Sequence, residues 1–269
     1  MDDYERIAKE IRKEILRIIY RAKAPHIGSS FSIVEILVAL YFNYLSVSPE
    51  TAQEGKRDKF ILSKGHGCPT LYATLAAKKF FGREVLDRFA IDGGRLEEHP
   101  TRNLKFGIEV STGSLGHGLS MGIGMALAEK YGRTNSKVVV LMSDGELNEG
   151  TVWEAAMFAA HHKLNNLIAI IDYNKLQALG KTNEVIKLEP LALKWQAFGW
   201  GTKEVDGHNI REIIRILKKV PFKADKPNCL IARTVKGKGV SFMENRVLWH
   251  YRCPNATEYA RALRELDAK

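Results

Sequence analysis

Asp144 and Asn174 are the residues of this chain whose types and spacing point most directly to chemistry. Each closely follows an apolar run that predicts a buried β-strand, residues 138–142 before Asp144 and residues 167–171 before Asn174. Mg²⁺ prefers oxygen ligands and often combines one or two protein groups with phosphate oxygens. A carboxylate and an amide at the ends of two strands therefore predict a site for a metal-bound diphosphate.

The residues between these strands predict how the two strand ends are placed. Residues 151–163 have a helical pattern, so strand, helix and strand form one βαβ unit whose strands end side by side, where ligands bind in open α/β sheets. Gly145 lacks a Cβ, and we expect it to let the backbone turn sharply after Asp144 and to bring an amide close to a phosphate. An isolated Asp-Gly pair is more often an ordinary turn, but the 28 residues between Gly145 and Asn174 favour a binding site.

This arrangement resembles the thiamine diphosphate-binding signature, in which a Gly-Asp-Gly triplet is followed, after a similar gap, by an asparagine. Asp144, Gly145 and Asn174 match it, and Ser143 stands where the first glycine is expected. The resemblance implies that the chain binds thiamine diphosphate through Mg²⁺ or another divalent cation. The metal ligands that it implies are Asp144, Asn174 and Leu176.

Further motifs extend the resemblance over nearly the whole chain. They occur in the order found in transketolases: residues 25–30 (Pro-His-Ile-Gly-Ser-Ser), 63–67 (Ser-Lys-Gly-His-Gly), 97–100 (Glu-Glu-His-Pro), 111–118, 144–150, 237–244 and 249–250 (Trp-His). The chain is therefore similar to the diphosphate-binding domain of transketolases. No pyrimidine-binding or C-terminal domain is recognisable after it, so the resemblance implies the N-terminal subunit of a split transketolase.

The resemblance also implies roles for four histidines, whose imidazoles titrate near neutral pH and suit proton transfer, although a single histidine is more often structural. His26 and His250 would face the substrate hydroxyl that is deprotonated during carbon–carbon cleavage. His99 would bind the terminal hydroxyl of the two-carbon unit, and His66 would lie near the cofactor. Tyr251 follows His250 where related chains carry a small glycine, and its side chain is large enough to crowd or redirect the loop.

The cofactor-binding residues implied by the same resemblance come from four segments. They are His66, Gly113, Ser114, Leu115, Gly116, Asp144, Gly145, Glu146 and Asn174. Residues 113–118 also read as a simple helix-opening turn, but amide groups at a helix N-terminus suit an anion.

The pattern of elements predicts the fold that positions these residues. Strands are expected at residues 59–62, 138–142, 167–171, 202–205 and 229–235, and helices at about 69–81, 117–131, 151–163, 189–198 and 210–220. Their alternation predicts an α/β fold with a mostly parallel sheet. We expect a three-layer sandwich with the thiamine diphosphate-binding fold, formed by residues 1–269 as a single domain.

The helix starts have their own signals. A first helix carries an apolar stripe made of Ile7, Ile11, Ile15, Ile18 and Ala22. Capping-box patterns predict two further starts, with Ser32 paired to Glu35 and Thr151 paired to Glu154.

The composition of the chain indicates which classes of partner it can bind. The chain has 41 Lys and Arg against 31 Asp and Glu, and this net charge of +10 favours anions such as a diphosphate and sugar phosphates. The basic residues are scattered along helices and match no nucleic-acid motif, so we expect no nucleic-acid partner. With no long apolar run or signal peptide, we expect no membrane partner and a cytoplasmic location. We expect the three cysteines to be reduced.

The resemblance implies reversible transfer of a two-carbon ketol unit from a ketose phosphate to an aldose phosphate, as in the pentose phosphate pathway. A C-terminal subunit carrying the pyrimidine domain would supply the glutamate that activates the cofactor, and the chain would homodimerise within a hetero-oligomer. Three alternatives stay open: the α-subunit of a 2-oxo acid dehydrogenase E1 component, a fragment of a 1-deoxyxylulose-5-phosphate synthase, and a non-catalytic basic binding protein that kept the fold.

Overall fold

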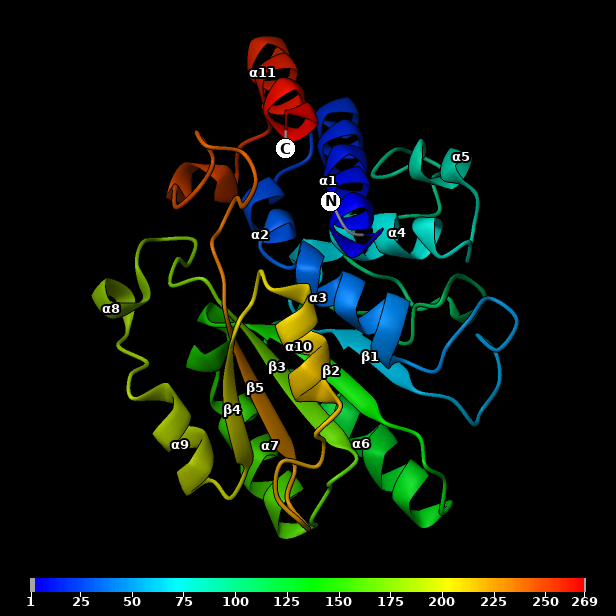
Figure 1. Cartoon of the computed structure of the whole chain (residues 1–269), viewed down its shortest axis with the longest axis vertical. Coiled ribbons are helices and arrows are strands. Elements are labelled where there is room, and N and C mark those ends of the chain that lie inside the picture. Colours follow the sequence, from blue (N-terminus) through cyan, green and yellow to red (C-terminus); the bar gives the residue numbers. More distant parts are fainter. Residues whose placement is uncertain (1–2, 269) are drawn as a thin grey trace.

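A five-stranded, fully parallel sheet forms the centre of the molecule in the computed structural model, which describes residues 3–268 (Figure 1). The strands are β1 (Lys59–Leu62), β2 (Val138–Ser143), β3 (Leu167–Tyr173), β4 (Gly201–Asp206) and β5 (Asn228–Arg233), in the order β1-β2-β3-β5-β4. The expected domain 1–269 includes Met1, Asp2 and Lys269, which lie outside the described residues.

The two central strands are apolar along nearly their whole length because helices cover both faces of the sheet. Every residue of β2 and β3 is buried. The register pairs Ser143 with Asp172, so both strands run past the expected ends at residues 142 and 171 and finish side by side. The expected βαβ unit is therefore present.

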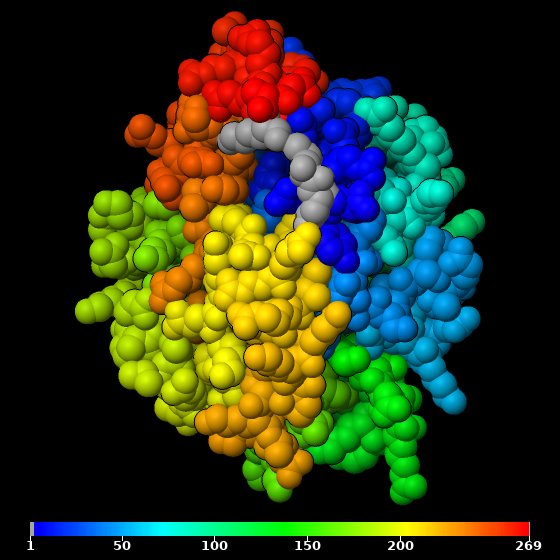
Figure 2. All heavy atoms as spheres, viewed as in Figure 1, coloured from blue at the N-terminus to red at the C-terminus, as the bar shows by residue number. Residues whose placement is uncertain are grey.

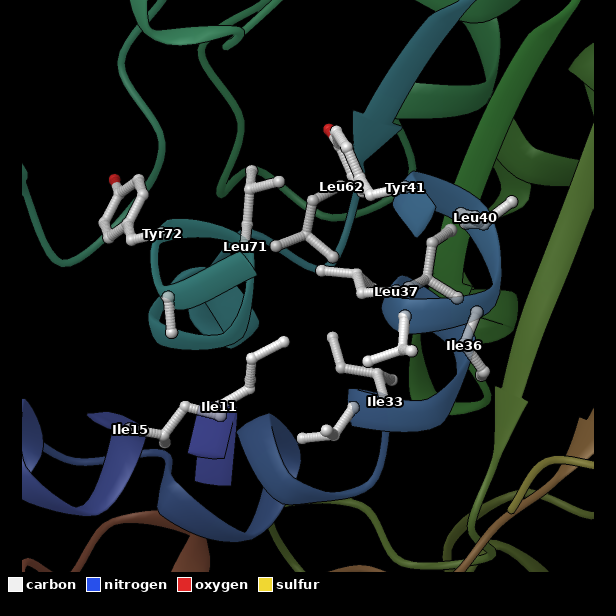
Figure 3. Packing of buried hydrophobic residues seen from close by; sticks show 14 of the residues in the cluster. Ile11, Ile15, Ile33, Ile36, Leu37, Leu40, Tyr41, Leu62, Leu71 and Tyr72 are labelled. Atoms are coloured by element: carbon white, nitrogen blue, oxygen red, sulfur yellow. The ribbon is translucent and has the colours of Figure 1, made fainter. Parts of the chain in front are cut away.

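On one side of the sheet, helices from both ends of the sequence build a shared core. They are α1 (Asp3–Ala22), α2 (Ile27–Phe31), α3 (Val34–Ala39), α4 (Cys68–Ala77), α10 (Ile210–Leu217) and α11 (Ala256–Asp267), and a π-helical turn, η1 (Leu40–Tyr44), continues α3. Ile11, Leu37 and Leu71 project from α1, α3 and α4 into the same core, which includes Val139 and Leu141 of β2 (Figure 3). Burying a side chain of this size contributes about 2 kcal/mol.

The opposite face packs against α6 (Gly118–Tyr131), α7 (Gly150–His161) and α9 (Leu191–Ala197). Its core takes the alternate residues of β2, including Val138 and Val140, as the two-residue period of a strand requires. Two cores on either side of one sheet make the three-layer sandwich that the sequence predicts. In the space-filling view, α10 (yellow) and α11 (red) form part of the surface of the helical layer that contains α1 to α4 (Figure 2).

Short elements join these parts. They are the helices α5 (Arg83–Leu86) and α8 (Thr182–Val185) and the 3₁₀ turns η2 (Gly65–Gly67), η3 (Leu104–Phe106), η4 (Gly145–Asn148) and η5 (Val247–His250). None of the helices in residues 3–268 combines the length and the apolar character needed to cross a membrane. All three cysteines are free thiols, as expected.

The predicted capping pairs are wrong, because tertiary partners take the side chains. The hydroxyl of Ser32 donates to Asp172 (2.7 Å) and lies within reach of the Ser29 carbonyl as an alternative acceptor, while Glu35 forms a buried ion pair with Arg12. Residue Ile33 precedes α3 without any side-chain cap.

Thr151 behaves similarly, since its hydroxyl donates to the Gly116 carbonyl and α7 begins at Gly150. A true capping box joins Asn255 and Glu258 at the start of α11, a helix that the sequence reading missed. Smaller differences concern element ends: β5 stops at Arg233 rather than at residue 235, and α4 stops at Ala77 rather than at residue 81.

Candidate functional site

A cleft of about 310 Å³ opens at the carboxyl ends of β2 and β3. Its wall combines loops that are far apart in the sequence: His26, Ser29, Lys64, His66, His99, Gly113, Leu115, Ser143, Asp144, Gly145, Asn174, Leu176, Gln177, Ala178, Leu179, Lys236, His250 and Tyr251. This is the place where open parallel sheets bind ligands. The four expected histidines and the three expected metal ligands all lie in this wall.

Asp144 directly follows β2, and its side chain is held by backbone groups. Its carboxylate accepts hydrogen bonds from the amides of Gly145 (2.7 Å) and Lys175 (2.6 Å), and the residue is 1% exposed. Burial, followed by the negative charge of Asp172, raises the pKa of Asp144 to about 7. A cation at this carboxylate would favour its charged form.

Asn174 and Leu176 contribute the other expected oxygen ligands. The Asn174 amide donates to Asp172 (3.0 Å), and its oxygen accepts from the Leu176 backbone N–H (3.0 Å), so the side chain has a fixed orientation. The Leu176 carbonyl accepts from Lys236 (3.1 Å). A carboxylate, an amide oxygen and a carbonyl suit a hard cation such as Mg²⁺.

No group of three His, Cys, Asp or Glu side chains within residues 3–268 is arranged to hold a metal. A cation at Asp144 would therefore need amide, carbonyl and ligand oxygens as well, and a diphosphate offers the last of these. The donor set of the cleft fits a cation that is bound together with a diphosphate.

A buried ion pair under the cleft was missed in the sequence. Lys64 and Asp172 are both fully buried, with 2.6 Å between Nζ and Oδ2, and Lys64 also donates to the Ser29 carbonyl (2.9 Å). Burial alone would raise the pKa of Asp172, but Lys64 and hydrogen bonds from Thr234 and Ser32 lower it below its ordinary value. Lys64 lies in the Ser-Lys-Gly-His-Gly motif, and Asp172 stands two residues before Asn174, so both signals were present.

The four histidines converge although more than 220 residues separate the first from the last. Ring centroids of His26 lie 5.2 Å from His66, 6.3 Å from His99 and 5.2 Å from His250. His66 and His250 are 5.6 Å apart. His26 precedes α2 with a left-handed backbone (φ 71°), and its N–H donates to the His250 carbonyl (2.9 Å).

Three of these imidazoles are neutral at physiological pH. Burial is the main cause, with the positive charges of Lys64 and Lys236 adding to it, and it lowers the pKa of His26 to about 4 and that of His250 to about 3. Burial also holds the pKa of His66 well below its ordinary value. The same effect lowers the pKa of Lys236 to about 8.

Tyr251 does not displace His250 from the cleft. Its side chain is 66% exposed, and its ring meets the His250 ring edge-on with 4.6 Å between centroids. Arg252 turns away, lies over the Trp249 ring and pairs with Glu258. The residue expected to crowd the loop forms part of the cleft wall instead.

The glycine-rich loop before α6 only partly faces the cleft. Gly113 and Leu115 line it, whereas Ser114 is exposed and Gly116 is buried outside the wall. Gly113 has φ +144°, and a Cβ there would lie 2.9 Å from Cδ2 of His99, so glycine is required.

Glu146 lies outside the cleft wall. Its buried carboxylate accepts from the Ser63 hydroxyl and from the amides of Gly116 (2.9 Å) and Ser143 (3.3 Å). It therefore ties the glycine-rich loop to the end of β2. At Gly145, η4 starts with no left-handed backbone, so the turn does not require glycine, although a Cβ there would come within 3.3 Å of Gln177. The expected approach of its amide to a phosphate stays a prediction.

Comparison with known proteins agrees with the fold and the cleft. A family model described as "Transketolase, thiamine diphosphate binding domain" matches residues 4–265. One of the subunits of the apulose-4-phosphate transketolase of Phocaeicola vulgatus is 47% identical over 96% of this chain and 92% of its own length. The 6-deoxy-6-sulfo-D-fructose transketolase subunit SqwG of a Clostridium species is 43% identical over 92% of this chain and 90% of its own length.

Solved structures agree. The transketolase from Leishmania mexicana superposes with a TM-score of 0.91 at 27% identity, covering 99% of this chain. This chain spans only 42% of that transketolase. The sheet, the cleft and these similarities together show that the chain belongs to the transketolase family and carries the family's thiamine diphosphate-binding domain.

Proposed function

We propose that this chain, with a partner subunit, transfers a two-carbon ketol unit reversibly from a ketose phosphate to an aldose phosphate. One observation carries the proposal: the oxygen ligands at Asp144, Asn174 and Leu176 share a single cleft with four histidines from distant loops. Thiamine diphosphate, when bound with a divalent cation such as Mg²⁺, supplies the carbanion-stabilising chemistry that such a transfer needs.

The residues of the cleft would divide the work of holding the cofactor. Asp144, Asn174 and the Leu176 carbonyl would hold the cation. Gly113, Leu115, Gly145 and His66 face the cleft and would contact the cofactor directly. Ser114, Gly116 and Glu146 are proposed to shape the loops that do so, because none of them faces the cleft.

The histidines would bind the hydroxyl groups of the substrate and transfer its protons. His26 and His250 are neutral, so each can accept a proton from a substrate hydroxyl, and their low pKa values favour its rapid return. His99 lies at the exposed rim and would hold the terminal hydroxyl of the two-carbon unit.

A partner is proposed because the relatives from Phocaeicola vulgatus and from the Clostridium species are named as transketolase subunits. That partner would carry the pyrimidine domain with the activating glutamate, and two copies of each chain would assemble. The sugar is proposed only as a ketose phosphate, because the relatives' names differ: one is named for apulose 4-phosphate and another for 6-deoxy-6-sulfo-D-fructose, which carries a sulfonate instead of a phosphate. Membership of the transketolase family leaves the 2-oxo acid dehydrogenase alternative without support.

The test is a transfer assay on the chain co-expressed with the product of the adjacent gene, which we expect to be the pyrimidine-domain subunit. Xylulose 5-phosphate and apulose 4-phosphate serve as donors and ribose 5-phosphate as acceptor, with and without thiamine diphosphate and Mg²⁺. We expect transfer only from the complex, because the proposed partner would supply the activating glutamate. Turnover by the pure chain alone would refute the split enzyme. Tight cofactor binding by a complex that transfers no ketol unit would favour a non-catalytic protein.

A further inference from the structure

His208 lies outside the cleft, between β4 and α10, and both of its ring nitrogens have partners. Nδ1 is 2.9 Å from a carboxylate oxygen of Glu35, and Nε2 accepts a hydrogen bond from the backbone N–H of Val235 (2.8 Å). A backbone N–H can only donate, so Nε2 carries no proton. The ring is therefore neutral, with its proton on Nδ1 donated to Glu35.

The Glu35 side of this contact is rigid. Glu35 is 7% exposed and pairs with Arg12 of α1, with 2.6 Å between Nη2 and Oε1. Arg12 also donates to the carbonyl of Lys238 (3.0 Å). The imidazole is thus fixed on one side by a buried ion pair that belongs to the helical layer.

The Val235 side of the contact leads into the cleft. Val235 stands between Thr234, whose hydroxyl donates to Asp172, and Lys236, which donates to His250 (2.8 Å between Nζ and Nδ1). Neighbouring backbone bonds hold Thr234 to Tyr173 (3.3 Å) and Lys236 to Asn245 (2.9 Å), but the amide of Val235 itself is held by His208.

We infer that His208 is a positioning residue for the cleft: it anchors the segment Thr234 to Lys236, so that the Lys236 ammonium stays against Nδ1 of His250. This keeps the His250 proton on Nε2. The inference rests on the proposed function, since it concerns the state of a histidine that we assign to proton transfer.

Two substitutions separate the two contacts of the ring. In His208→Asn, the amide nitrogen of the shorter side chain takes the place of Nδ1, which keeps the bond to Glu35 and removes the acceptor for Val235. In His208→Gln, the amide oxygen reaches the place of Nε2, which keeps that acceptor and removes the donor to Glu35. Each variant loses one hydrogen bond, so a purely structural role predicts similar losses of melting temperature and activity.

The experiment measures the chain alone and the complex with its partner subunit. In the chain we expect His208→Asn to speed amide exchange at Val235 and to shift the ¹⁵N resonance of His250 Nδ1 away from that of a hydrogen-bonded acceptor, while His208→Gln stays like wild type. In the complex, His208→Asn should lower kcat about five- to tenfold with KM within about twofold, and His208→Gln should restore it.

Equal behaviour of the two variants, or an unchanged His250 resonance in His208→Asn, would overturn the inference. The spectroscopic result does not depend on turnover. If the wild-type complex transfers no ketol unit while the His208→Asn chain shows the expected His250 shift, the proposed function is refuted and the role of His208 stays in place.

Discussion

Lys236 donates a hydrogen bond to His250, with 2.8 Å between Nζ and Nδ1. An ammonium has no acceptor to offer, so Nδ1 must be unprotonated and the neutral ring carries its proton on Nε2. A residue that the sequence reading did not assign to the site thus sets the tautomer of one that it did.

This relationship predicts the effect of Lys236→Met, which keeps much of the side-chain length but removes the donor. The His250 tautomer would no longer be fixed, and we expect kcat of the complex to fall about tenfold or more. Lys238→Met is the matched control, because that side chain is 39% exposed and lies outside the cleft wall. Equal kinetics of the two variants would show that the lysine contact has no role in turnover.

Asp144→Ala should abolish Mg²⁺-dependent cofactor binding, since it removes the only carboxylate among the proposed cation ligands. Asn174→Ala should weaken binding less, because an amide oxygen is a neutral ligand. Titrating thiamine diphosphate into the complex with and without Mg²⁺ measures both effects. Asp92→Ala, at an exposed acid outside the cleft wall, controls for the change in net charge. An unchanged affinity in Asp144→Ala would remove the metal assignment.

His99→Ala should lower kcat/KM of the complex by about a hundredfold and leave cofactor affinity nearly unchanged, because its proposed contact is with substrate. The ring also packs on Gly113, so a structural role is the competing explanation. That role predicts a lower melting temperature with normal kinetics per folded molecule. His161→Ala, at the exposed end of α7, is the control.

The buried histidines predict a pH dependence of stability. An unfolded histidine has a pKa near 6.5, whereas the pKa of His26 is about 4 and that of His250 about 3 in the folded chain. Below about pH 6.5 the unfolded state therefore binds protons that the folded state does not, and their contribution to stability falls until the pH reaches the folded pKa.

The raised pKa of Asp144, about 7, has the opposite effect on stability, because the folded state then binds a proton that the unfolded state does not. The contribution of His250 is therefore measured by comparing wild type with a variant that lacks this histidine. Urea unfolding of wild type and His250→Asn at pH 7.5 and 5.5 should show the variant losing less stability on acidification, by on the order of 1 kcal/mol. Parallel pH profiles would mean that His250 is not buried in neutral form.

Much of the fold could be predicted because the central strands are buried on both faces. The apolar runs at residues 138–142 and 167–171 leave no other reading, and the polar residues after them mark the cleft. The capping pairs failed for the opposite reason. Ser32, Glu35 and Thr151 fit a local pattern, but partners distant in sequence offered them better hydrogen bonds.

Site residues that stand in a sequence motif could be predicted, whereas contacts between side chains far apart in the sequence could not. The four histidines and Asp144 stand in recognisable loops. The contacts from Lys64 to Asp172 and from Lys236 to His250 join distant parts of the chain, and neither residue type nor spacing shows which charges are buried together. The sequence likewise does not reveal that Glu146 points away from the cleft and toward Ser63.

At residue 26 the needs of folding and of chemistry oppose each other. A left-handed backbone at a residue other than glycine costs about 1 kcal/mol, and the half-buried His26 adopts it. A glycine there would relax the backbone but leave the cleft without its central imidazole. Replacing His26 by glycine to raise thermal stability would therefore remove a proposed catalytic group. Stabilising substitutions should be sought elsewhere in the fold.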